Sequence, residues 1–328
     1  MKKPIVFMFS GQGSQYYHMG KELFHNHPVF RKWMLHMDDI SQRLIGRSVI
    51  QEIYHEQRRK EEKFVRTLIT HPAIFMLEYA LSQVLLESGI KPDYVLGTSL
   101  GEFTAIAVSE CMRVEDVLAC IIKQAEAIES LCKNSGMLAI LGNISVYHEN
   151  QMLFKHIELA SMNYHSHFVV SGENERLTEV IRYLAENNIL YQSLPVSYGF
   201  HSSCMDPAEE TYKTFLRAKS FRKPVIPTIS SLFGAQLVEI PNHYLWEAVR
   251  SPIQFQEALL GLERRSACTY LDLGPAGTLA NFTKYNLPKD SMSQCYSIVT
   301  PFGQDMKNVM KIESLLKVAD FKMMNGVN

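Results

Sequence analysis

The sequence predicts an α/β protein in which a parallel sheet carries a nucleophile and a smaller α+β unit is inserted. Two short apolar runs, residues 4–9 and 94–96, each end in a glycine-rich turn. Buried strands of a parallel sheet produce such runs. Residues 137–196 instead alternate strand and helix patterns in the order β-α-β-β-α-β. We therefore expect one larger and one smaller core.

The composition is that of an ordinary globular chain. It has 328 residues, of which 46% are hydrophobic and 20% charged, with a formal net charge of -1. This charge provides no long-range field for nucleic acid or an anionic membrane. The first apolar run stops after five residues, at Ser10, and we find no run of membrane-spanning length. We expect a cytoplasmic monomer that binds neither nucleic acid nor membrane.

The six cysteines show neither metal-ligand nor disulfide-framework spacing, so we expect reduced thiols and no metal site. The loop at residues 10–15 follows a buried strand but matches neither the dinucleotide fingerprint nor the P-loop. Its glycines let the backbone near Gln12 approach a ligand at the carboxyl edge of the sheet.

The helices that follow are predicted from apolar periodicity. Residues 17–54 are largely helical, and residues 52–66 are a solvated segment of mixed charge. A long apolar helix covers residues 73–87, with Pro72 near its first turn. Another helix begins near residue 113. Gln124 lies at the edge of its apolar stripe, where periodicity alone favours a surface amide.

Ser99 is the candidate nucleophile. It stands in Gly97-Thr98-Ser99-Leu100-Gly101, between an apolar strand and a helix. This strand-turn-helix context is required of a nucleophile elbow, which exposes the serine hydroxyl above a helix N-terminus. A glycine-bounded loop is the alternative interpretation.

The inserted unit has the element order of a ferredoxin-like fold. Its strands are expected at residues 137–141, 159–163, 168–171 and 189–196, and its helices at 149–156 and 173–187. We therefore assign residues 1–134 and 197–328 to the catalytic domain and residues 135–196 to the small domain.

His201 follows the insertion in a loop of small residues, where the chain re-enters the domain of Ser99. A lone histidine is often structural, but this position makes it a candidate general base. The remaining elements are expected to be helices at 207–220, 244–249 and 306–318, another helix after Pro252, and strands at 225–230 and 270–273.

Several motifs together resemble malonyl-CoA:acyl-carrier-protein acyltransferases. In chain order they are Gly11-Gln12-Gly13-Ser14-Gln15, Gly97 to Glu102, Asn163 with Val170-Ser171-Gly172, Phe200-His201-Ser202, Arg250-Ser251-Pro252 and Leu273-Gly274-Pro275. The chain looks most like the free-standing acyltransferases and acyl hydrolases of bacterial trans-acyltransferase polyketide synthases. The resemblance implies an α/β-hydrolase-like catalytic domain and a ferredoxin-like small domain.

The resemblance also implies roles for individual residues. Ser99 would attack a thioester, His201 would act as its base, and the backbone N–H groups of Gln12 and Leu100 would bind the oxyanion. The carbonyl of Ala248 would orient the histidine. Phe200, Asn163 and Gln124 would contact the substrate. The acyl group would arrive on the phosphopantetheine of an acyl carrier protein or on CoA, with no other cofactor.

Two departures from the family pattern matter. Aligning Glu115-Asp116 with the family's matching acidic pair puts Gln124 where malonyl-selective members carry an arginine that binds the carboxylate. Thr98 replaces the histidine that is common before the nucleophile. A neutral amide cannot neutralise a buried carboxylate. This favours an acyl hydrolase that removes stalled neutral groups from carrier proteins. A malonyltransferase, with Phe200 in its support, and a non-catalytic carrier-binding module are the alternatives.

Overall fold

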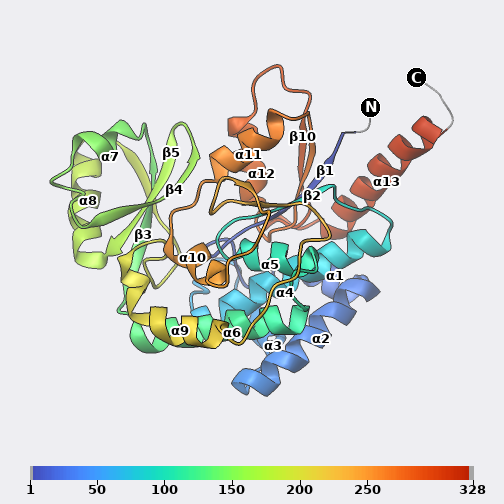
Figure 1. Ribbon diagram of the computed structural model, residues 1–328, viewed down its shortest axis with the longest axis horizontal. Helices are drawn as coiled ribbons and strands as arrows, with labels where there is room; N and C mark the ends of the chain where they lie inside the picture. Colours follow the sequence, from blue (N-terminus) through green and yellow to red (C-terminus); the bar gives the residue numbers. More distant parts are fainter. Residues whose placement is uncertain (1–2, 325–328) are drawn as a thin grey trace.

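The computed structural model describes residues 3–324, which form two sheets with helices packed around them (Figure 1). The larger sheet has the order β10-β9-β1-β2-β7-β8. Its strands are Gln294–Ser297, Thr269–Asp272, Ile5–Phe9, Tyr94–Gly97, Thr228–Ser230 and Ala235–Gln236, in that order. The first five are parallel and β8 is antiparallel to β7. The predicted α/β class is confirmed.

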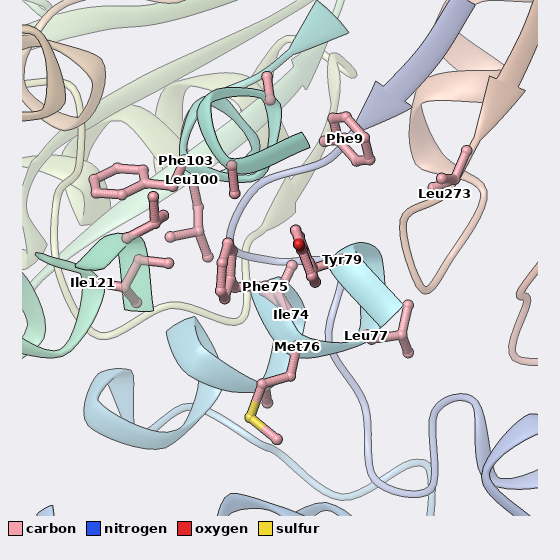
Figure 2. Packing of buried hydrophobic residues seen from close by; sticks show 14 of the residues in the cluster. Phe9, Ile74, Phe75, Met76, Leu77, Tyr79, Leu100, Phe103, Ile121 and Leu273 are labelled. Atoms are coloured by element: carbon pink, nitrogen blue, oxygen red, sulfur yellow. The ribbon is translucent and has the colours of Figure 1, made fainter. Parts of the chain in front are cut away.

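Helices cover both faces of this sheet. Successive side chains of β1 point to opposite faces, and all five are buried. Ile5, Phe7 and Phe9 belong to one hydrophobic cluster, whereas Val6 and Met8 belong to another. The first cluster is formed with α2 (Pro28–Ile45), α4 (Thr67–Glu87), α5 (Gly101–Val108) and α6 (Val114–Leu131). The second is formed with α11 (Phe255–Glu263) and α12 (Thr278–Asn286). Figure 2 shows residues of α4, α5 and α6 packed together beside Phe9.

Helix α4 is long and apolar enough to span a membrane by length and composition, with 21 residues. The expectation that no segment reaches this length was therefore wrong. In the structure 89% of its most apolar window is buried, because α2, α5 and α6 all pack against it. A helix that is enclosed on all sides is apolar all round, so its composition reflects the protein core.

Helix α4 also begins six residues before the predicted position, so that Pro72 lies inside it. The cause is a contact from another helix. The Glu129 carboxylate of α6 accepts a hydrogen bond from the backbone N–H of Leu68 at 2.7 Å. A carboxylate at a helix N-terminus satisfies an N–H group that has no partner within the helix. No local signal in residues 66–72 reports this contact.

The second sheet is antiparallel and has the order β4-β5-β3-β6. Its strands are Ile157–Tyr164, His167–Glu173, Ser135–Leu141 and Leu190–Ser193, and α8 (Asn174–Glu186) covers one face. With chain order β-α-β-β-α-β, this sheet order is the ferredoxin-like arrangement. Strand β4 also contacts α11 and α12, and just before α11 the Ile253 N–H donates to the Ala160 carbonyl at 2.8 Å.

The first helix of the small sheet does not lie at residues 149–156. Helix α7 spans Ser145–Glu149, and the following residues form turns. The Asn143 side chain accepts a hydrogen bond from the Ser145 N–H, and the Asn150 side chain donates to the Val146 carbonyl. These two asparagines stabilise the helix ends at earlier positions than periodicity indicates.

The remaining elements connect these layers. They are α1 (Lys21–Asn26), α3 (Val49–Ile53), a 3₁₀ helix (Ser203–Ala208), α9 (Glu209–Leu216), α10 (Tyr244–Arg250) and α13 (Asp305–Met324). The predicted helix at 207–220 is therefore shorter and begins as a 3₁₀ turn, and the strand at 225–230 shrinks to β7. Strand β10 and helix α12 were not predicted.

Removing the Glu129 carboxylate should weaken the start of α4. We expect Glu129→Ala to lower the free energy of unfolding by about 1 kcal/mol, the usual effect of losing a helix cap. Urea unfolding followed by circular dichroism measures it. Glu126→Ala, on the same helix, is the control, because its carboxylate forms only a surface pair with Lys123. Equal stability of the two variants would contradict the capping role.

Candidate active site

Ser99 lies on a tight turn between β2 and α5, as an elbow requires. Its φ of 57° is in the left-handed region, which residues other than glycine seldom adopt. The turn brings α5 directly against β1. A Cβ on Gly101 would lie 2.0 Å from the carbonyl oxygen of Phe9, so no larger residue fits there. The strained conformation is therefore held by the packing of α5 on β1.

The Ser99 hydroxyl is paired with His201. Ser99 Oγ lies 2.8 Å from His201 Nε2, and His201 Nδ1 lies 2.8 Å from the carbonyl oxygen of Ser251. A carbonyl can only accept, so Nδ1 must carry the proton and Nε2 is left to accept from Ser99. The geometry is that of a serine with a general base held in the required tautomer.

The carbonyl that orients the histidine was assigned to the wrong residue. Ser251, rather than Ala248, makes the contact. Ala248 is buried within α10, where carbonyls point along the helix axis. Ser251 follows the last helical residue and has extended backbone angles, which turn its carbonyl out of the helix. Two residues earlier, within the last turn of α10, the Val249 carbonyl accepts a hydrogen bond from the backbone N–H of His201 at 2.8 Å.

Burial keeps the His201 imidazole neutral. Desolvation lowers the pKa of His201 to about 4, although the Ser251 carbonyl favours the protonated form. The imidazole is therefore available to take a proton at neutral pH. The backbone φ of His201, 61°, is also left-handed, so both Ser99 and His201 are in uncommon backbone conformations. Such conformations cluster at functional sites.

Two backbone N–H groups near Ser99 have no acceptor among residues 3–324. They belong to Gln12 and to Leu100, the residue just before α5. The Gln12 loop passes close to the nucleophile, because a Cβ on Gly11 would lie 3.2 Å from Ser99 Oγ. Thr70 of α4 fixes this loop by accepting from the Gln12 side-chain amide at 2.8 Å. The two groups are the expected donors for an oxyanion.

A cavity of about 350 Å³ opens over Ser99 between the two sheets. Its lining includes Gln12, Ser99, Asn163, Phe200 and His201, five of the residues assigned from sequence. No lysine or arginine lines this cavity in the part of the chain that the structure describes. Its second imidazole, that of His167, has a pKa lowered by burial. The wall around Ser99 is thus uncharged at neutral pH.

Gln124 does not line this cavity, and it is not the surface amide that periodicity favours. It is only 1% exposed, and its amide lies near His71 of α4 and Tyr212 of α9. The His71 ring in turn lies 5.4 Å from the ring of Phe200, centre to centre. Gln124 is thus linked through His71 to Phe200, which lines the cavity. Lys123, the next residue, points outward and pairs with Glu126, as its helical position predicts.

A buried carboxylate that sequence analysis did not assign supports the site. Glu102, on the first turn of α5, accepts hydrogen bonds from the Ser231 N–H at 2.7 Å and from the Tyr244 hydroxyl at 2.7 Å. These contacts join the elbow helix to the end of β7 and to α10, which positions Ser251. Burial raises the pKa of Glu102 to about 7. The sequence signal that could have identified Glu102 is a glutamate in a helix whose other residues are apolar or small.

This combination of elbow, serine, histidine and ferredoxin-like insert is shared with a known family. Residues 6–325 match the family model described as the acyl transferase domain. The chain belongs to this acyl transferase family.

Among its relatives, the polyketide biosynthesis acyltransferase homolog PksD of Bacillus subtilis is 52% identical over 95% of this chain and 97% of its own length. The homolog BaeD of Bacillus velezensis is 50% identical with the same coverage.

Solved structures agree on the fold. The acyltransferase domain from the second module of the salinomycin polyketide synthase superposes with a TM-score of 0.85 at 25% identity, covering 95% of this chain and 72% of that one. FabD from Acinetobacter baumannii superposes with a TM-score of 0.84 at 22% identity, covering 97% and 100%. At such low identity the second comparison establishes the architecture alone.

The lowered pKa of His201 predicts how Ser99 reactivity depends on pH. The rate of Ser99 modification by a sulfonyl fluoride should stay nearly constant from pH 8 to pH 5.5. An imidazole with the ordinary pKa near 6.5 would instead slow it about tenfold over this range. Intact-mass spectrometry measures the rate, with Ser99→Ala as the unlabelled control. A midpoint near pH 6.5 would show that His201 is more solvated than its burial indicates.

Proposed function

We propose that this protein is a hydrolase of polyketide biosynthesis that releases uncharged acyl groups from acyl carrier protein thioesters. The observation that carries the proposal is the uncharged wall of the cavity over Ser99, which contains no lysine or arginine. A malonyl carboxylate buried there would lack a cationic partner, at a cost of several kcal/mol. Acetyl and other neutral groups carry no such cost.

The residues support a two-step reaction. Ser99 Oγ attacks the thioester carbonyl while His201 Nε2 takes its proton, and the N–H groups of Gln12 and Leu100 stabilise the oxyanion. The imidazolium, held by the Ser251 carbonyl, then protonates the departing thiolate and leaves an acyl-serine. In the second step His201 takes a proton from water, which attacks the ester. Collapse of the second oxyanion releases the acid and restores Ser99.

The names of the relatives support polyketide biosynthesis as the setting. The missing cation supports hydrolysis over the loading of malonyl units. An enzyme that binds malonyl groups poorly is unsuited to supplying extender units, whereas it can clear neutral groups that stall an assembly line. Water then becomes the acceptor for the acyl-serine.

The test compares two carrier-bound groups. The protein is incubated with acetyl- and malonyl-loaded acyl carrier protein, and separately with malonyl-CoA and free carrier protein. We expect rapid loss of acetyl, slow loss of malonyl and little loading, each followed by intact mass. Ser99→Ala should release neither group. Efficient loading of the carrier from malonyl-CoA would instead establish a malonyltransferase.

Placing a cation behind Phe200 should change the preferred group. We expect Gln124→Arg to raise kcat/KM for malonyl relative to acetyl by about tenfold or more, because a guanidinium can pair with a carboxylate. Lys123→Arg is the matched control, since Lys123 faces outward on the same helix. An unchanged ratio in Gln124→Arg would show that the acyl group does not reach this position.

A further inference from the structure

Glu78 on α4 is a fully buried carboxyl beside the Gln12 loop, with an exposure of 0%. Its Oε1 accepts a hydrogen bond from the Ser10 N–H at 2.6 Å and lies 3.0 Å from Ser10 Oγ. Its Oε2 accepts from the Thr104 hydroxyl at 2.8 Å. Ser10 opens the loop after β1, and Thr104 lies on α5, which begins just after Leu100. Glu78 therefore connects the two segments that supply the oxyanion donors.

The contacts continue from Ser10 to the peptide that carries the Gln12 N–H. Ser10 Oγ lies 3.1 Å from Ser14 Oγ, and the Ser14 hydroxyl donates to the Gly11 carbonyl at 2.8 Å. The Gly11 carbonyl and the Gln12 N–H belong to one planar peptide unit, in which they point in opposite directions. A hydrogen bond that holds the carbonyl therefore also fixes the direction of the N–H.

This peptide lies against the nucleophile. A Cβ on Gly11 would lie 2.8 Å from Ser99 Cβ and 3.2 Å from Ser99 Oγ. Rotation of the peptide would turn its N–H away from an oxyanion formed on Ser99 while Ser99 itself stayed in place. Loss of one oxyanion donor typically slows such a reaction by about a hundredfold or more. The orientation of one peptide can therefore control the rate.

Counting protons shows which form of Glu78 completes these contacts. A carbonyl only accepts, so the single proton of the Ser14 hydroxyl is used on Gly11, and Ser10 must donate to Ser14. Ser10 then has no proton left for Glu78, so the carboxyl must donate to Ser10. Burial raises the pKa of Glu78 to about 8, and the charge of Asp272 adds to the shift. The carboxyl is thus mostly protonated at pH 7, as the count requires.

The glycine of the Leu273-Gly274-Pro275 motif leaves room for these hydroxyls. A Cβ on Gly274 would collide with Ser10 Oγ and Ser10 Cβ. A larger residue there would push Ser10 away from its partners. The motif is distant in sequence, but it belongs to the same packed unit as the Gln12 loop.

We propose that protonated Glu78 acts through Ser10 and Ser14 to direct the Gln12 N–H at the oxyanion. Glu78 is a positioning residue, because it acts through the loop. The inference rests on the part of the proposed function in which this N–H stabilises the oxyanion. It is independent of whether water or a carrier protein finally accepts the acyl group.

The experiment compares two esters that differ in the atom that becomes negatively charged. Attack by Ser99 on 4-nitrophenyl acetate places the charge on oxygen, whereas attack on its thiono analogue, with C=S in place of C=O, places it on sulfur. Sulfur is a weak hydrogen-bond acceptor. With the protein in excess, the release of 4-nitrophenolate measures acylation of Ser99 in a single turnover. The ratio of the two rates reports on the oxyanion donors, whereas damage to Ser99 lowers both rates together.

We expect Ser14→Ala to lower the rate with the oxygen ester by on the order of tenfold and to change the thiono rate by about twofold or less. Glu78→Gln should also lower the ratio, because no single amide atom can both accept from the Ser10 N–H and donate to the Ser10 hydroxyl. Ser82→Ala is the matched control. Ser82 is buried on the same helix and donates to the Tyr79 carbonyl, so the ratio should stay unchanged.

An unchanged ratio in Ser14→Ala, with both rates kept or lowered together, would overturn the inference. An unchanged ratio in Glu78→Gln beside a reduced ratio in Ser14→Ala would overturn the role of Glu78. Failure of the hydrolase proposal leaves this test intact, because acylation of Ser99 precedes the step in which water or a carrier accepts the acyl group. The two proposals therefore fail separately.

Discussion

The contact between Ser99 Oγ and His201 Nε2 joins segments 102 residues apart, and the architecture of the large sheet serves to maintain it. β2 places Ser99 on the elbow, while α10 and the residue after it fix the position of His201. Glu102 ties these two parts together through Ser231 and Tyr244. A buried carboxylate with several donors is suited to this purpose, because losing one partner would leave polar groups unpaired.

Electrostatics then limits which acyl groups can occupy the site. Both imidazoles beside the cavity have lowered pKa values because burial disfavours their charged forms. No lysine or arginine in the described lining of the cavity supplies a positive charge in place of the neutral imidazoles. The proposed preference for uncharged acyl groups rests on this lining.

Sequence analysis succeeded where the signal was local. The elbow around Ser99 and the β-α-β-β-α-β order after residue 134 are each encoded in a few consecutive residues. It failed where a distant residue decided the outcome. Glu129 sets the start of α4, and the orienting carbonyl depends on where α10 ends. Helix ends and carbonyl directions depend on caps and tertiary contacts that periodicity does not record.

The sequence by itself predicted Ser99 as the nucleophile, His201 as a candidate base and the α/β architecture, because the glycines of the elbow and the short apolar runs before them restrict the local backbone. It also determined that residue 124 is a neutral amide. Only the tertiary structure decided that Gln124 is buried with His71 and Tyr212 behind Phe200. These four side chains come from separate parts of the chain, and they become buried together only when the helices pack.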